Sequence, residues 1–215
     1  MLDNRRFIAR RAARYFKVGD VVNLGIGIPN LCAEFTEKGI MFETENGLIG
    51  VGDAATDVMV TDRFCDAGSN PFVPMPGASV FDTAYSFAII RSGRMAATVL
   101  GALQVSARGD LANWATPNRR FGMGGAMDLC NGARKVIVAM ELTARDGARK
   151  IVNECSYPLT AMQCVNHIVT EQCVIDVTET GLVLKEIHQG RTPEDIQAQV
   201  EPKLILADDW TVMEE

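Results

Sequence analysis

Short apolar runs recur along the chain and predict the strands of an α/β fold. The runs are rich in valine, isoleucine and leucine, and the segments between them are mostly long enough to hold helices. One run, 135–140, is almost continuously apolar, which is typical of a strand covered on both faces in a largely parallel sheet. The predicted strands occupy residues 21–24, 97–100, 135–140, 173–177 and 182–187.

The N-terminal segment 5–17 carries six basic side chains and no acidic one, a composition that superficially resembles a transit peptide. The alternative, which we favour, is a short helix of the mature protein with one apolar side. The side chains expected on or near its buried face are those of Phe7, Ile8, Ala12, Tyr15 and Phe16.

Three further helices are predicted from their start signals. Residues 160–163 have capping-box spacing, with Leu159 placed to pack on Cys164, so a helix is expected through about Val169. Thr192 and Pro193 provide an N-cap and a first helical position for a helix that runs to about Val200. Residues 82–90 form the third helix, behind a loop at 77–79.

No repeat, low-complexity tract or linker interrupts the chain, so residues 1–215 are interpreted as a single domain. An apolar content of 47% is ample for a continuous core. The net charge of −6 disfavours nucleic acid or an anionic membrane as the main partner. The longest uncharged stretches, 67–81 and 155–170, are too short to span a bilayer.

Six cysteines lie scattered along the chain without a C-x-x-C pair, which indicates reduced and largely buried thiols. The N-terminus lacks the apolar core of a secretory signal, so we expect a cytoplasmic protein. Three chemistries find no support. The only histidines, His167 and His188, have no second ligand at a useful spacing, so no metal site is expected. Phe81 stands where the G-x-S-x-G motif of a serine hydrolase needs its last glycine. The sequence contains no P-loop motif, so a P-loop nucleotide hydrolase is not supported either.

Glycine-rich loops and carboxylates remain as candidates. In the first loop, Asn23 precedes Gly25 and Gly27, after a predicted strand and before a predicted helix from about Asn30. A dinucleotide fingerprint needs glycine at Asn30, so that function is disfavoured. The glycines either permit a tight turn or let backbone amides face an anionic or carbonyl ligand beside Asn23.

Glu45 precedes the second loop, where Asn46 and Gly47 have the residue types of a two-residue hairpin turn. The spacing alone does not select Glu45 as catalytic, although the nearby glycines leave room for a substrate carbonyl. In the third loop, Gly124 and Gly125 follow Gly122. This loop is either a flexible turn or a set of backbone N–H donors for an oxyanion.

Taken in order, these motifs resemble the β subunits of the family I CoA-transferases. The likeness extends from about Asp3 to Ala207, is strongest to the β subunits of acetate or butyrate/acetoacetate CoA-transferases, and includes the C-terminal half of fused 3-oxoacid enzymes. The motifs that carry it are Asn-Leu-Gly-Ile-Gly-Ile-Pro at 23–29, Glu-Asn-Gly at 45–47, Leu-Ala-Asn-Trp at 111–114 and Gly-Met-Gly-Gly-Ala-Met-Asp-Leu at 122–129.

The resemblance implies an open three-layer α/β/α fold and a role for Glu45 as covalent nucleophile, since it matches the glutamate of a Ser-Glu-Asn-Gly motif. Asn23, Gly124 and Gly125 become candidates for positioning and oxyanion stabilisation, and Gly25, Gly27, Asn46 and Gly47 for the substrate or CoA loops. Two departures stand out: Thr44 replaces the motif serine, and Asp66-Ala67-Gly68-Ser69 replaces an Asn-Ala-Gly-Lys, so a basic contact to CoA is missing there.

The family chemistry needs no metal or permanently bound cofactor, because coenzyme A is itself a substrate. The implied partners are a separate α subunit that completes the site, an acyl-CoA and a short-chain carboxylate such as acetate, butyrate or acetoacetate. Two alternatives stay open: a noncatalytic acyl-CoA-binding regulatory subunit, and, from the fold relationship alone, a sugar-phosphate isomerase.

Overall fold

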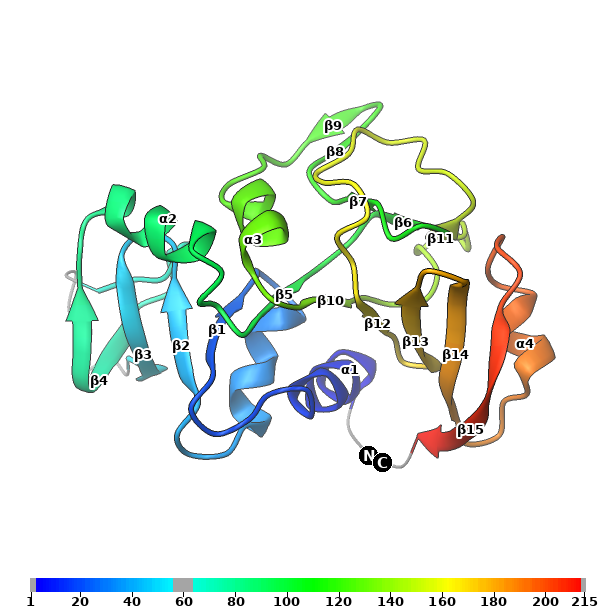
Figure 1. The fold of residues 1–215 in the computed structure, drawn as a ribbon, viewed down its shortest axis with the longest axis horizontal. Helices are drawn as coiled ribbons and strands as arrows, with labels where there is room; N and C mark the ends of the chain where they lie inside the picture. The colour runs from blue at the N-terminus through cyan, green and yellow to red at the C-terminus, as the bar shows by residue number, and fades with distance from the viewer. Residues whose placement is uncertain (1–2, 56–63, 214–215) are drawn as a thin grey trace.

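A ten-stranded mixed sheet runs through the computed structural model, which describes residues 3–55 and 64–213 (Figure 1). The ends of the domain predicted over 1–215, and residues 56–63 within it, therefore lie outside the described part. Across the sheet the strands are β15 (Ile205–Met213), β14 (Gly181–His188), β13 (Cys173–Thr178), β12 (His167–Val169), β10 (Val136–Ala139), β5 (Ala97–Leu100), β1 (Val21–Leu24), β2 (Met41–Thr44), β3 (Leu48–Ala54) and β4 (Phe72–Val80).

The centre of this sheet is parallel. β12, β10, β5, β1 and β2 pair in parallel, whereas β3 and β4 on one side and β13 and β14 on the other join through antiparallel pairings. Every residue of β5 and β10 is buried, as expected for strands covered on both faces. All five predicted strand runs are confirmed.

Helices and a smaller sheet cover the two faces, which confirms the three-layer α/β/α arrangement. α1 (Asn4–Ala13) and the 3-10 helix η1 (Pro29–Phe35) cover one face. The other face carries α2 (Thr83–Arg91), α3 (Ala126–Gly132) and a sheet of β11 (Ile151–Val152), β6 (Gln104–Ser106) and β7 (Leu111–Ala112) (Figure 1). The remaining elements are a hairpin of β8 (Ala115–Thr116) and β9 (Arg119–Arg120), and α4 (Pro193–Gln197).

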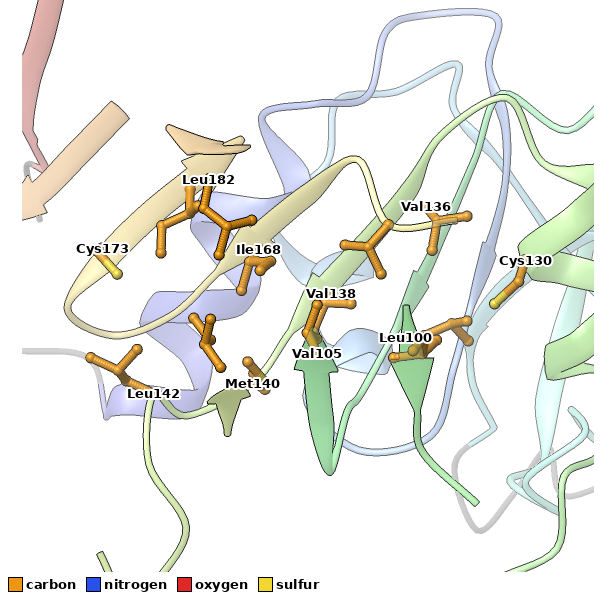
Figure 2. Packing of buried hydrophobic residues seen from close by; sticks show 14 of the residues in the cluster. Leu100, Val105, Cys130, Val136, Val138, Met140, Leu142, Ile168, Cys173 and Leu182 are labelled. Carbon is orange, nitrogen blue, oxygen red and sulfur yellow. The ribbon is translucent and has the colours of Figure 1, made fainter. Parts of the chain in front are cut away.

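Successive side chains of β10 pack alternately into two hydrophobic cores, one on each face of the sheet. Val136 and Val138 point into the cluster under α2 and α3, seen in Figure 2, while Ile137 and Ala139 pack beneath α1. Successive side chains of a strand face opposite sides of a sheet, so one continuous apolar run contributes to both cores.

The N-terminal helix is confirmed, although it ends at Ala13 rather than continuing to residue 17. Phe7, Ile8 and Ala12 are buried, as is Phe16 beyond the helix end, and Tyr15 is half-buried. Arg11 of α1 also forms a largely buried ion pair with Glu186 of β14. The segment is therefore part of the folded core.

The helix predicted over 160–169 is wrong. Thr160 and Ala161 instead pair their backbone with Leu111, the N–H groups of residues 164 and 165 both donate to Gly109, and β12 begins at His167. The Thr160 hydroxyl donates to the Asn113 side chain rather than capping a helix. The backbone N–H groups that a helix at this position would need therefore bond to residues distant in the sequence.

The other two predicted helices, after residue 82 and after Thr192, are present in the structure. The loop expected at 77–79 is wrong, since these residues belong to β4, but the helix after it is confirmed as α2, capped by Asp82. α4 begins with a reciprocal capping box between Thr192 and Asp195 and ends at Gln197, three residues short of the predicted end.

The thiols agree in part with the prediction of buried cysteines. All six are free, but only Cys32, Cys130 and Cys173 are buried, while Cys65 is exposed. Among the described residues, no helix is long and apolar enough to cross a bilayer.

Candidate active site

Glu45 lies at the first position after β2, in the turn that joins this strand to β3. The pairing of Thr44 with Leu48 confirms a hairpin here, but its turn holds three residues, 45–47, rather than the predicted two. β1 lies beside β2 in parallel, and Asn23 of β1 extends its side-chain nitrogen to 3.2 Å from Oε2 of Glu45. The carboxyl ends of both strands thus bring these two residues together, at the edge where open α/β sheets bind ligands.

A cavity of about 940 Å³ opens at this edge and contains Glu45 in its wall. Its other walls come from the loop after β1, the loop after β5, the segment before β4 and the glycine loop before α3. Of the candidate residues, Asn23, Gly25, Glu45, Gly124 and Gly125 line the cavity.

Gly124 and Gly125 lie directly against the Glu45 carboxylate. A Cβ atom built on Gly125 would lie 3.3 Å from Oε1 of Glu45, and one on Gly124 would lie 3.8 Å from the same oxygen. Among the described residues, neither glycine N–H donates a hydrogen bond to the protein. The structure therefore places two glycines beside the carboxylate, where a side chain would fill the space.

The other loop residues have structural surroundings of their own. Gly25 donates its N–H to the carbonyl of Val99, and this contact is so close that a Cβ would lie 3.1 Å from that oxygen. Gly27 adopts a φ of +93°, in the left-handed region that favours glycine. Gly27, Asn46 and Gly47 are not among the residues that line the cavity, so their part in binding stays a prediction.

Thr44 ties the Glu45 turn to the segment 65–70. Its hydroxyl donates to Oδ1 of Asn46 at 2.7 Å and accepts the N–H of Ala67 at 2.9 Å, while Asn46 donates to the carbonyl of Cys65. Threonine therefore provides the hydroxyl that the family's serine would supply. Asp66 accepts hydrogen bonds from the N–H groups of Gly68 and Asn70, so it caps its own turn on the cavity wall.

Glu43 is a second carboxylate of the site, and the sequence reasoning missed it. It is only 3% exposed, and it precedes Glu45 by two positions, so both side chains lie on one face of the sheet. Alternation along β2 was the signal that could have revealed it. Burial raises the pKa of Glu43 to about 7, although hydrogen bonds from Asn23 and Ser86 oppose this rise.

Comparison with known proteins identifies the family. Residues 6–199 match the model of a family described as Coenzyme A transferase. The chain belongs to the coenzyme A transferase family. An acetate CoA-transferase subunit β of Escherichia coli (strain K12) is 43% identical over 211 residues, covering 97% of this chain and 96% of the relative. A probable coenzyme A transferase subunit β of Bacillus subtilis (strain 168) is also 43% identical, over 203 residues, covering 93% of this chain and 94% of the relative.

The fold is shared with a solved CoA-transferase. The apoenzyme of an acyl-CoA transferase from Escherichia coli O157:H7 superposes with a TM-score of 0.79 at 21% identity, covering 100% of this chain and 44% of the larger one. The resemblance inferred from the sequence motifs is thus confirmed: the chain is a CoA-transferase of the β-subunit type.

Proposed function

We propose that this chain is the β subunit of a short-chain acyl-CoA:carboxylate CoA-transferase in which Glu45 is the nucleophile. The observation that carries the proposal is the position of its carboxylate, held by Asn23 on one oxygen and flanked by Gly124 and Gly125 on the other, in the wall of a cavity. The similarity to an acetate CoA-transferase β subunit supports acetate as one substrate, and we propose acetoacetyl-CoA or butyryl-CoA as the CoA donor.

The first half-reaction begins with attack by the Glu45 carboxylate on the thioester carbonyl of the acyl-CoA. The C–S bond breaks, CoA leaves as a thiolate, and an acyl-glutamyl anhydride forms. The thiolate then attacks the glutamyl carbonyl, the anhydride C–O bond breaks, and the donor acid leaves as a carboxylate. One negative charge enters with Glu45 and one leaves with the acid, so the resulting glutamyl-CoA thioester is neutral.

The acceptor acid runs these steps in reverse. Its carboxylate attacks the glutamyl-CoA thioester, and the released thiolate takes the acyl group from the new anhydride, which regenerates Glu45. No metal or permanently bound cofactor has a role in this scheme, and coenzyme A acts as substrate. The free thiols of the chain suit a reducing compartment, so we place the reaction in the cytoplasm.

Each attack produces a tetrahedral intermediate with a negative oxygen. We propose that the N–H groups of Gly124 and Gly125 stabilise this oxyanion, and one good donor contributes about 3 kcal/mol to such a step. Asn23 holds the carboxylate in one orientation and so reduces the entropy lost on the way to attack. Gly25 lines the cavity beside the nucleophile, and we propose Gly27, Asn46 and Gly47 as further residues of the substrate or CoA loops.

A separate α subunit is the proposed partner, because the anhydride must be kept from water. Large apolar side chains stand exposed among the cavity-lining residues: Ile26 is 73% exposed, Phe121 51% and Met123 38%. Exposed apolar side chains around a cavity are typical of a surface that another chain covers. We propose neither nucleic acid nor a membrane as a partner.

The deciding experiment is intact-mass measurement of the copurified αβ complex after incubation with acetoacetyl-CoA, followed by peptide mapping. CoA attached at Glu45 is the expected result, and hydroxylamine should remove it. The Glu45→Gln complex should form no adduct and show no exchange, whereas Glu179→Gln, an amide substitution at an exposed hairpin position, should behave as wild type.

Three outcomes would overturn the assignment. A folded complex that binds acyl-CoA without forming an adduct indicates the noncatalytic regulatory subunit. A chain that ignores acyl-CoA and needs no α partner but isomerises phosphorylated sugars indicates the isomerase alternative. Near-normal exchange by Glu45→Gln would move the nucleophile to another residue.

A further inference from the structure

Asn23 contacts two carboxylates through one amide nitrogen. Its Nδ2 atom lies 2.9 Å from Oε2 of Glu43 and 3.2 Å from Oε2 of Glu45. The strand register fixes this arrangement, since Asn23 and Glu43 are direct partners in the parallel pairing of β1 with β2. The orientation of the amide toward Glu45 therefore depends on its second bond to Glu43.

The surroundings of Glu43 provide hydrogen bonds rather than positive charge. The Ser86 hydroxyl of α2 lies 2.8 Å from Oε1 of Glu43, and the Thr98 hydroxyl of β5 lies 3.4 Å from Oδ1 of Asn23. The titratable group that acts on Glu43 is Glu45, from the turn after the same strand. Among residues 3–55 and 64–213, no lysine, arginine or histidine contributes to its pKa.

The charge on Glu45 adds to the effect of burial and raises the pKa of Glu43 further. The charge on Glu45 thus disfavours the ionised form of Glu43, and the two carboxylates share one donor. This link matters for catalysis only if the charge on Glu45 changes during turnover.

We propose that Glu43 is a positioning residue that fixes the Asn23 amide on Glu45 and couples its own proton to the covalent state of that nucleophile. The inference rests on the proposed function, in which the Glu45 carboxylate becomes a neutral glutamyl-CoA thioester and the charge leaves with the donor acid. Formation of the thioester removes the negative charge that opposes ionisation of Glu43. Glu43 then releases its proton at lower pH in the covalent enzyme than in the free enzyme.

The coupling has a definite sign. At low pH, Glu43 is protonated in both states, and its charge does not affect the equilibrium between them. As the pH rises through about 7, the free enzyme must hold two neighbouring negative charges, whereas the thioester holds one. The equilibrium therefore shifts toward the covalent intermediate with rising pH. The largest possible shift equals the ratio of the acid dissociation constants of Glu43 in the covalent and the free enzyme.

Substitution by glutamine separates the two parts of this role. The amide oxygen of Glu43→Gln can still accept from Asn23, and its nitrogen can donate to the Ser86 oxygen, so the position of the Asn23 amide is kept. The titrating proton is lost. A residue that is only structural would give the same pH profile with either side chain.

The test measures the fraction of αβ complex that carries CoA on Glu45, by intact mass, between pH 6 and 8.5. The ratio of acetoacetyl-CoA to acetoacetate is held constant, so the adduct fraction reports the equilibrium. In the wild type, the ratio of covalent to free enzyme should rise roughly threefold to fivefold over this range, for half to one pKa unit of coupling. Glu43→Gln should give a flat profile, and the control Glu179→Gln should keep the wild-type rise.

A second variant covers the case in which Glu43→Gln does not fold. Ser86→Ala removes a hydrogen bond that lowers the pKa of Glu43, so the midpoint of the rise should move to higher pH. A flat wild-type profile, a rise retained by Glu43→Gln, or an unmoved midpoint in Ser86→Ala would each overturn the inference. Absence of any adduct on the wild-type enzyme at every pH would instead overturn the proposed function.

Discussion

Gly47 lies against the backbone of Phe81 at a distance that admits no side chain. The N–H of Phe81 donates to the carbonyl of Gly47 at 2.9 Å, and a Cβ on Gly47 would lie 2.1 Å from the carbonyl oxygen of Phe81. Gly47 also adopts a φ of +122°, outside the range of ordinary residues. This contact anchors the turn that contains Glu45 to the segment just before α2.

Substitution of Gly47 by alanine should therefore cost much more stability than a positive φ alone explains. We expect Gly47→Ala to lower the free energy of unfolding by about 3 kcal/mol or more, from backbone strain and overpacking together. Gly190→Ala is the matched control, because Gly190 has a φ of +83° with no atom within 4 Å of its built Cβ. Urea unfolding of the two variants measures the difference, and equal losses would show that the contact with Phe81 is unimportant.

Shortening the nucleophile should separate transfer from hydrolysis. Glu45→Asp withdraws the carboxylate by about one methylene, away from Asn23 and from the glycine N–H groups. We expect acyl transfer to fall steeply while hydrolysis takes a larger share of the remaining turnover. The measurement compares free CoA release with acyl-CoA product formation, and an unchanged ratio of the two would contradict the proposed positioning.

The pattern of apolar runs predicted five strands of the ten-stranded sheet, whereas the helix-start signal at 160–163 was misleading. The run at 135–140 predicts β10 because a continuous apolar stretch has few alternatives to a strand covered on both faces. The capping spacing at Thr160 failed, since distant partners at Gly109 and Leu111 accept the hydrogen bonds of that segment. A local pattern contains no information about such partners.

The candidate site shows the same limit. Family resemblance, rather than spacing, selected Glu45 among the acidic residues, and the structure then placed Asn23 and Gly125 beside it. Alternation along β2 places Glu43 on the same face as Glu45, but this pattern alone does not show which residue Glu43 contacts. Its importance follows from parallel pairing with Asn23, a contact between segments twenty residues apart.

The hydroxyl of Thr44 should contribute more than its methyl group to stability and to the formation of the Glu45 adduct. Thr44→Ser keeps the bonds to Asn46 and Ala67, whereas Thr44→Val keeps the shape and leaves the Ala67 N–H and the Asn46 side chain without this partner. Asn46 and Ala67 are exposed, so each lost contact costs about 0.5–1.5 kcal/mol, the net contribution of a typical hydrogen bond. We expect Thr44→Val to unfold at lower urea concentration and to form the Glu45 adduct more slowly, with Thr44→Ser close to wild type. Identical behaviour of the two variants would contradict this role.

Glu43 should make the stability of the fold depend on pH. Burial raises its pKa from an ordinary value of 4.5 to about 7, so between these pH values the folded chain binds more protons than the unfolded chain. The contribution of Glu43 to stability must therefore decrease as the pH rises through this window, by about 3 kcal/mol in total at 1.36 kcal/mol per pKa unit. Below pH 4.5 and above pH 7 the contribution of Glu43 is constant.

Glu43→Gln should remove that dependence. Urea unfolding at about pH 5, 6, 7 and 8 gives the stability difference between variant and wild type, and this difference should move in favour of the variant as the pH rises toward 7 and then level off. The exposed control Glu179→Gln should keep the wild-type slope, because its side chain is not buried on folding. A constant difference between Glu43→Gln and wild type across this range would mean that Glu43 is already ionised at the lowest pH in the folded protein, and that burial beside Asn23 and Ser86 does not disfavour its charge.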